Sequence, residues 1–148
     1  MNADILVSFF ERDLNKLINE IELYKNEENI WRLEKNISNS AGNLALHLIG
    51  NLNTFIGKEI GKTNYVRDRE LEFSQKNVPR KELIENINDT IQMVKDSLLH
   101  LRPEELKADY PILKFSEITT TEYLLVHLAM HLTYHLGQIN YHRRLLED

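Results

Sequence analysis

Two histidines, His131 and His135, stand four residues apart late in the chain, and His47 lies far before them. Side chains four residues apart on a helix are separated by about 6 Å along one face, so both imidazoles can reach one metal ion. Three neutral imidazoles form a plausible set of ligands for a divalent metal and leave a position free for water or substrate. The pair alone is a weak signal, because histidines at this spacing are more often structural.

The segments that carry these histidines are unusual because they contain no Asp, Glu, Lys or Arg. One runs from Asn36 through Gly57 and the other from Tyr123 through His142. At about 100° per residue, each segment has a polar stripe with a histidine at its middle. The first stripe holds Ser40, Asn43, His47, Gly50, Asn51 and Thr54, and the second holds His127, His131, His135, Gln138 and His142. The two stripes predict an internal polar cavity with a metal site formed by His47, His131 and His135.

The other histidines fit this site less well. His127 lies one turn before His131, so it is either a fourth ligand or a group that supports the ligands. His142 lies about 10 Å beyond His135 along the helix and is too far away to share the ion. His100 is expected at a helix C-terminus, where a cation interacts favourably with the helix dipole.

Several classes of metal site are excluded by the residues themselves. The chain has no Cys, which removes thiol nucleophiles, disulfides, iron–sulfur clusters and thiolate zinc sites. A di-iron bundle requires Glu-x-x-His motifs on two helices, and none of the histidines has Glu three residues before it. A zinc protease motif of the His-Glu-x-x-His type is absent for the same reason.

Hydrophobic periodicity predicts four helices to carry these stripes. They cover residues 3–24, residues 40–60, a third segment that opens at Pro79, and residues 119–146, with Thr119 as N-cap and Glu122 completing a capping box. The connections 61–78 and 101–118 are long, and an extended loop of that length could span the bundle and leave its flanking helices parallel. We therefore expect residues 1–148 to form one all-α domain, a four-helix bundle with a long crossover between the second and third helices.

Composition limits the partners of this domain. The 18 Lys and Arg residues are outnumbered by 23 Asp and Glu residues, and the net charge of −5 argues against a nucleic-acid partner. The uncharged segments contain too many polar groups for a membrane span. The beginning of the sequence lacks the pattern of a signal peptide, so a cytoplasmic location is expected. The uncharged fourth helix is expected to be covered by a second subunit, which predicts a homodimer.

The last helix resembles a known family. The segment from His131 to Ile139, HLTYHLGQI, is similar to the HxxxHxGQI signature of the DinB-like superfamily, and His47 matches the earlier histidine of its three-histidine site. The resemblance covers nearly the whole chain, and the residues from Arg67 to Phe73 are similar to the RxRxxEF segment of an uncharacterised branch. It implies an up-down-down-up four-helix bundle, a zinc or nickel ion and frequent dimers. Characterised relatives include thiol-dependent S-transferases and a mycothiol-dependent isomerase, and many members have no known reaction.

The residues around the site leave two interpretations of Arg67 and Arg69 open. They could bind an anionic group at the mouth of the cavity, or they could pair with Asp68, Glu70 and Glu72 in a solvated loop, which is the more common situation. Tyr134 and Gln138 flank the ligands and are expected to orient imidazoles. Asn43 and Asn51 are expected to line the cavity or hold water there.

Two functions remain open at this point. The first is a metal-dependent enzyme acting on a small molecule, of the thiol S-transferase or hydrolase type, in which the metal lowers the pKa of a bound water or low-molecular-weight thiol. The second is a non-catalytic module for dimerisation or small-molecule binding, stabilised by the metal. The absence of Asp and Glu from both histidine stripes slightly favours the second.

Overall fold

A computed structural model describes residues 1–147 as an all-helical protein, with no strand among these residues. The predicted all-α fold class is confirmed. The elements are α1 (Ala3–Leu23), the 3-10 helix η1 (Glu27–Trp31), α2 (Ala41–Leu52), the π-helix η2 (Asn53–Lys58), α3 (Arg69–Ser74), α4 (Arg80–Leu98), α5 (Pro103–Lys107) and α6 (Thr121–Leu146).

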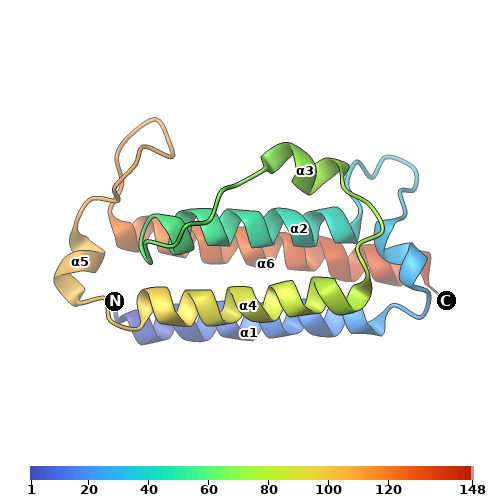
Figure 1. The fold of residues 1–148 in the computed structure, drawn as a ribbon, viewed down its shortest axis with the longest axis horizontal. Helices are drawn as coiled ribbons and strands as arrows, with labels where there is room; N and C mark the ends of the chain where they lie inside the picture. Colours follow the sequence, from blue (N-terminus) through green and yellow to red (C-terminus); the bar gives the residue numbers. More distant parts are fainter. Residues whose placement is uncertain (148) are drawn as a thin grey trace.

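Four long helices lie side by side (Figure 1). Helix α1 packs against α4 and α6, and α2 packs against α6 and α4. In the view of Figure 1, α1 and α6 run from left to right, whereas α2 and α4 run from right to left. The segment between α2 and α4 returns along the outside of α2 and carries α3. This segment reaches the same part of α2 that carries His47.

The long helices form because their apolar residues recur every three or four positions. In α1 the buried side chains include Leu6, Phe10, Leu14, Leu17 and Ile21. The same spacing occurs in α4, where Leu83, Ile87, Val94 and Leu98 are buried. Each helix therefore presents one continuous apolar face to the shared core.

The start of α6 differs from the prediction by one residue. Thr120, not Thr119, is the N-cap, and its side chain accepts a hydrogen bond from the backbone N–H of Tyr123. The Thr119 carbonyl is occupied because it accepts the backbone N–H of Tyr110 at 2.8 Å. Glu122 does not complete a capping box, and its carboxylate pairs with the N-terminal ammonium group at 3.0 Å.

The connections contain structure that the hydrophobic pattern did not reveal. The predicted loop 61–78 contains α3, the predicted loop 101–118 contains α5, and η1 follows α1. The predicted second helix also changes character, because residues Asn53–Lys58 form a π-helix rather than continuing α2. The Tyr110 hydroxyl donates to the Phe55 carbonyl at 2.6 Å and so satisfies an acceptor in this wider turn.

None of the helices described is both long enough and apolar enough to cross a membrane.

Candidate metal centre

The structure brings His47 of α2 together with His131 and His135 of α6. One ring nitrogen from each residue lies within 4.8 Å of the other two. The Nε2 atom of His131 is 3.3 Å from Nε2 of His47 and 3.1 Å from Nε2 of His135. Helices α2 and α6 can place these rings together because the two helices pack side by side. These are the three residues that the spacing singled out.

The outer nitrogen of His47 faces a carboxylate. Its Nδ1 atom is 3.1 Å from Oε1 of Glu72, and a carboxylate can only accept, so Nδ1 carries the hydrogen. Arg67 Nη2 also lies 3.4 Å from this nitrogen, but it makes a shorter bond of 3.0 Å to the same carboxylate oxygen. The Nε2 atom of His47 therefore carries no hydrogen, and its lone pair points toward His131.

His135 is oriented in the same way by its own helix. Its Nδ1 atom is 2.7 Å from Oε1 of Gln138, an amide oxygen that accepts, so its Nε2 is also a lone pair. His131 lies between these two acceptors, and a neutral imidazole has only one N–H to offer. The buried Nδ1 of His131 has no hydrogen-bond partner among the described residues. The Nε2 atom of His131 therefore faces at least one other Nε2 atom with no hydrogen between the two nitrogens.

This arrangement fits a divalent metal ion, which would accept all three lone pairs at once. Burial and the neighbouring imidazoles His135 and His47 lower the pKa of His131 to about 3. Burial also lowers the pKa of His47, although the hydrogen bond that His47 donates to Glu72 acts in the opposite direction. His47 and His131 therefore favour the neutral imidazole, the form that binds metals.

The structure separates the remaining histidines from this cluster. The Nε2–H of His142 donates to the Arg32 carbonyl at 2.8 Å, and its Nδ1 accepts the Tyr24 hydroxyl at 2.6 Å. His142 is therefore a satisfied buried side chain. The His127 ring stacks on His131 with centroids 6.4 Å apart and packs edge-on against Phe115, but it does not belong to the group within 4.8 Å.

Glu72 was missed as a neighbour of the site and was assigned instead to a solvated loop. The structure corrects this prediction, because the Glu72 and Arg67 side chains are 6% and 15% exposed. An ion pair between Arg67 and Glu72 was one of the two interpretations, but this pair lies against His47. Phe73 also packs on the His47 ring with centroids 5.0 Å apart. The RxRxxEF segment was the sequence signal that could have identified Glu72. Three of its residues, Arg67, Glu72 and Phe73, contact His47.

The other flanking residues have mixed outcomes. Arg69 is exposed, and no ion pair involving it is found among residues 1–147. Gln138 contacts His135 as expected, whereas Tyr134 packs edge-on against that ring with centroids 5.3 Å apart. Asn43 donates to the carbonyls of Glu72 and Gln75 rather than lining the metal site.

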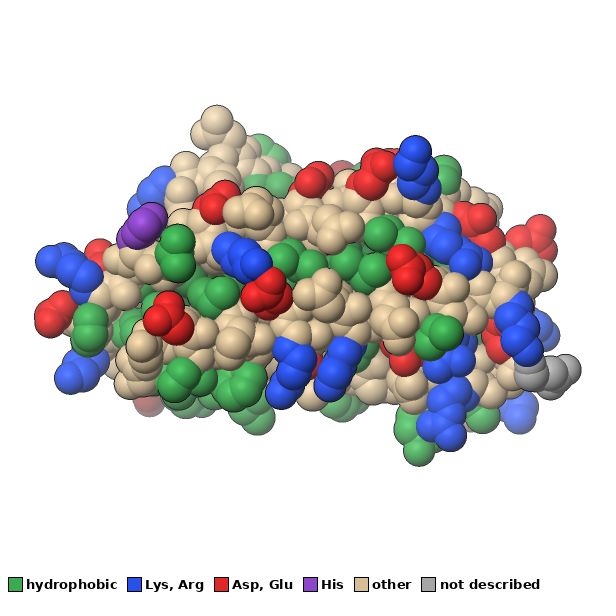
Figure 2. All heavy atoms as spheres, turned by 90° about the horizontal axis from the view of Figure 1, so that it is seen from below, with side chains coloured by type: hydrophobic (Ala, Val, Ile, Leu, Met, Phe, Trp, Pro, Cys, Tyr) green, Lys and Arg blue, Asp and Glu red, His purple; other side chains and the backbone are tan. Residues whose placement is uncertain are grey.

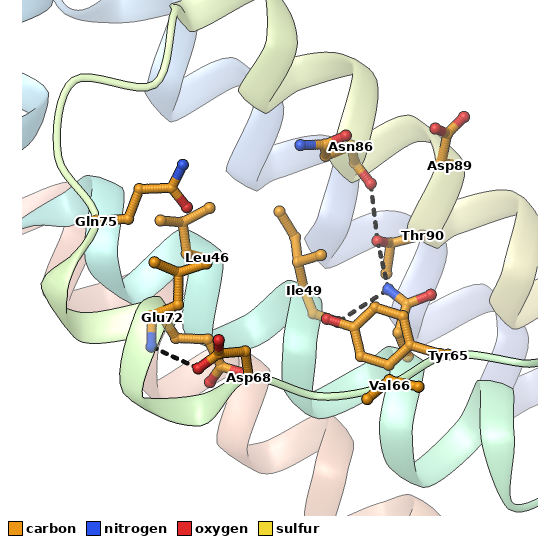
Figure 3. Close-up of a pocket in the computed structure, with 12 residues that line it drawn as sticks. Leu46, Ile49, Tyr65, Val66, Asp68, Glu72, Gln75, Asn86, Asp89 and Thr90 are labelled. Carbon is orange, nitrogen blue, oxygen red and sulfur yellow. Dashed lines mark hydrogen bonds between the residues drawn. The ribbon is translucent and has the colours of Figure 1, made fainter.

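Two cavities border these residues. One of about 510 Å³ is lined by His135, Gln138 and the residues that precede α2, and none of the described residues that line it is Asp, Glu, Lys or Arg. The other, of about 400 Å³, lies between α2, α3 and α4. Figure 3 shows Glu72 at one end of this second cavity and Asp89 at the other. The lining of this cavity is acidic, because it includes Asp68, Glu72 and Asp89, and none of its described residues is Lys or Arg.

These features define a class: an all-helical protein in which two uncharged helix faces bring three histidines together. A family model described as "Protein of unknown function (DUF1572)" matches residues 8–148. The chain therefore belongs to the DUF1572 family. No curated protein matches the sequence.

Proposed function

We propose that this protein binds one divalent metal ion, zinc or nickel, through His47, His131 and His135, and acts as a metal-dependent enzyme on a small molecule. The observation that supports this most directly is the meeting of three ring nitrogens within 4.8 Å. Two of these rings are fixed by acceptors on their far side, Glu72 and Gln138, so that their lone pairs point inward. A hydrogen-bonded core without a metal has no need for this arrangement.

A metal in this position would supply a Lewis acid that lowers the pKa of a bound water or thiol. The chain's own residues would hold the ion, orient its ligands and bind the substrate. His47, His131 and His135 hold the ion, and Gln138 orients the His135 ring. The uncharged cavity of about 510 Å³ beside His135 suits a small polar substrate, because amide and hydroxyl side chains line it. Thiol S-transfer or hydrolysis are the reaction types we propose.

A second candidate function is a non-catalytic module for dimerisation or small-molecule binding. The hydrogen bonds of Glu72, the carboxylate that contacts the cluster, favour this second function. Both of its oxygens accept hydrogen bonds from Arg67, and one also faces His47. Glu72 is therefore not free to take a proton from a substrate, so acid–base chemistry would depend on the substrate or on water.

Thiol binding by the cobalt-loaded protein separates the two functions. We expect 2-mercaptoethanol to produce charge-transfer absorption when added to the wild-type protein loaded with cobalt. The same thiol should produce no such absorption with His131→Ala. A cobalt spectrum that does not change with thiol would contradict the transferase proposal and favour the second candidate.

We also propose that the chain is a DinB-like protein with the up-down-down-up bundle topology. The HxxxHxGQI-like segment of α6 and the helix directions described above support this. Antiparallel α2 and α4 in an experimental structure would contradict it.

We propose further that two copies of the chain pair through α6. The helix exposes large side chains, Tyr123, Met130, Tyr134, Tyr141 and Leu145, each at least 60% exposed. A largely apolar groove of about 650 Å³ runs between α1 and α6. By contrast, acidic and basic side chains are spread over the face formed by α1 and α4 (Figure 2). Exposed apolar patches of this kind mark interaction sites.

A further inference from the structure

The buried pair formed by Arg67 and Glu72 lies directly behind one of the three histidines. Arg67 Nε donates to Glu72 Oε2 at 2.9 Å, and its Nη2 donates to Oε1 at 3.0 Å. The same Oε1 atom is 3.1 Å from His47 Nδ1. A bidentate arginine fixes a carboxylate in position and orientation, so the oxygen that faces His47 is held in place.

The backbone around Glu72 is built to bring this carboxylate close to α2. Gly50 makes room for it, because a Cβ atom at this position would lie 1.9 Å from Glu72 Oε2. Asn43, two turns earlier on α2, donates its Nδ2 to the Glu72 carbonyl at 2.9 Å and to the Gln75 carbonyl at 2.8 Å. Helix α3 is thereby anchored to α2 on the side of His47 that faces away from α6.

We propose that Glu72 is a positioning residue for the metal site, which selects the Nδ1–H tautomer of His47 and holds its Nε2 lone pair toward His131 and His135. This inference rests on the proposed function, because it assigns a role relative to the metal. Arg67 acts through Glu72 by holding its carboxylate. Gly50 acts by leaving the space that the carboxylate fills.

A purely structural ion pair is the competing explanation for these contacts. Buried ion pairs are often no more stabilising than apolar residues of similar volume, so burial alone does not explain the pair. The two explanations differ in what they predict for His47. A structural pair would stabilise the fold whichever tautomer His47 adopts. A positioning carboxylate would fix that tautomer and strengthen metal binding, as acceptors behind metal-binding histidines do elsewhere.

Zinc affinity tests the proposal first. We expect Glu72→Gln to weaken zinc binding about 10–100-fold, as measured by competition with a chelator. Glu70→Gln is the matched control, since Glu70 is exposed on the same short helix. Circular dichroism and thermal unfolding show whether each variant is folded. Equal zinc affinity for folded Glu72→Gln and Glu70→Gln would overturn the proposal while leaving the three-histidine site intact.

The tautomer of His47 can be read without any metal. Long-range proton–nitrogen NMR correlations of the metal-free protein should show the hydrogen on Nδ1 of His47. The opposite tautomer, in which Nδ1 accepts from Arg67, would overturn the proposal even if no variant folded. Gly50→Ala should displace Glu72 and lower zinc affinity, whereas Gly137→Ala should not, because nothing lies within 4 Å of a Cβ atom there.

Metal binding by the wild-type protein and by Glu72→Gln separates a failure of the metal site from a failure of the role of Glu72. Wild-type protein that binds neither zinc nor nickel would contradict the proposed function itself, whatever the tautomer of His47. Wild-type protein that binds zinc, with unchanged affinity in folded Glu72→Gln, would contradict only the role of Glu72.

Discussion

His131 and His142 lie on one polar stripe of α6, yet their hydrogen bonds give them different roles. Both nitrogens of His142 have a partner, the Arg32 carbonyl and the Tyr24 hydroxyl. The Nδ1 atom of His131 has no hydrogen-bond partner among residues 1–147, and its Nε2 atom faces two other imidazoles. At the scale of single residues, the hydrogen-bond partners of each ring thus distinguish a structural histidine from a ligand.

Tyr24→Phe tests the structural role of His142. The change removes the hydroxyl that donates to Nδ1 and leaves a buried acceptor unsatisfied, which should lower the free energy of unfolding by about 1–3 kcal/mol. Denaturant unfolding gives this value. Tyr65→Phe is the control, because the Tyr65 hydroxyl makes no hydrogen bond among residues 1–147 and lies outside the proposed α6 interface, so its loss should change the free energy of unfolding by less than about 0.5 kcal/mol.

The pH dependence of stability offers a second test at this scale. Burial lowers the pKa of His142 in the folded protein, although its hydrogen bond to Arg32 acts in the opposite direction. As the pH falls below about 6.5, the unfolded chain takes up a proton that folded His142 does not. The free energy of unfolding should therefore fall toward acid pH, by up to about 1.4 kcal/mol per pH unit for each such proton.

His142→Gln should make this dependence less steep in metal-free protein, because the proton taken up on unfolding is lost with the imidazole. Denaturant unfolding of both proteins between pH 8 and pH 5 measures the difference. Parallel curves would show that His142 titrates alike in the folded and unfolded states.

At the scale of elements, the helices carry the ligands and the connections supply the groups behind them. Two glycines show how closely this arrangement is packed. Within one subunit, Gly137→Ala should raise the free energy of unfolding by about 0.5–1 kcal/mol, because the position is helical and a Cβ atom there would meet nothing within 4 Å. Gly50→Ala should lower it, because the new Cβ would meet the Glu72 carboxylate at 1.9 Å. Thermal unfolding of the two variants compares them, and two changes of the same sign would contradict the packing described here.

The sequence predicted the helical part of the site but not the part that comes from the crossover. His47, His131 and His135 could be found because helical periodicity defines which residues share a face. Glu72 could not, since 25 residues separate it from His47 and the path of the chain between them is set by packing. The short helices α3 and α5 were missed because each has too few residues to show a hydrophobic period.

For the assembly as a whole, the proposed dimer accounts for a long helix whose exposed face carries no Asp, Glu, Lys or Arg from Tyr123 to His142. Light scattering at micromolar concentration should give twice the 17.5 kDa mass of the chain. Met130→Glu should shift the protein toward monomer, because Met130 is 67% exposed within this face and a charge buried between subunits would be costly. Asn15→Glu, at an exposed position on α1, is the control. A strictly monomeric wild-type protein would contradict the dimer.

The metal content of the purified protein shows whether the three histidines form a metal site. Elemental analysis of wild-type protein prepared without chelator should find close to one divalent ion per chain, with zinc or nickel predominating. His47→Ala and His131→Ala should each lose most of it, because two imidazoles remain where three are needed. His100→Ala should keep it, since His100 is exposed at the end of α4. Full metal retention in both cluster variants, or wild-type protein that takes up no divalent ion, would contradict the three-histidine metal site.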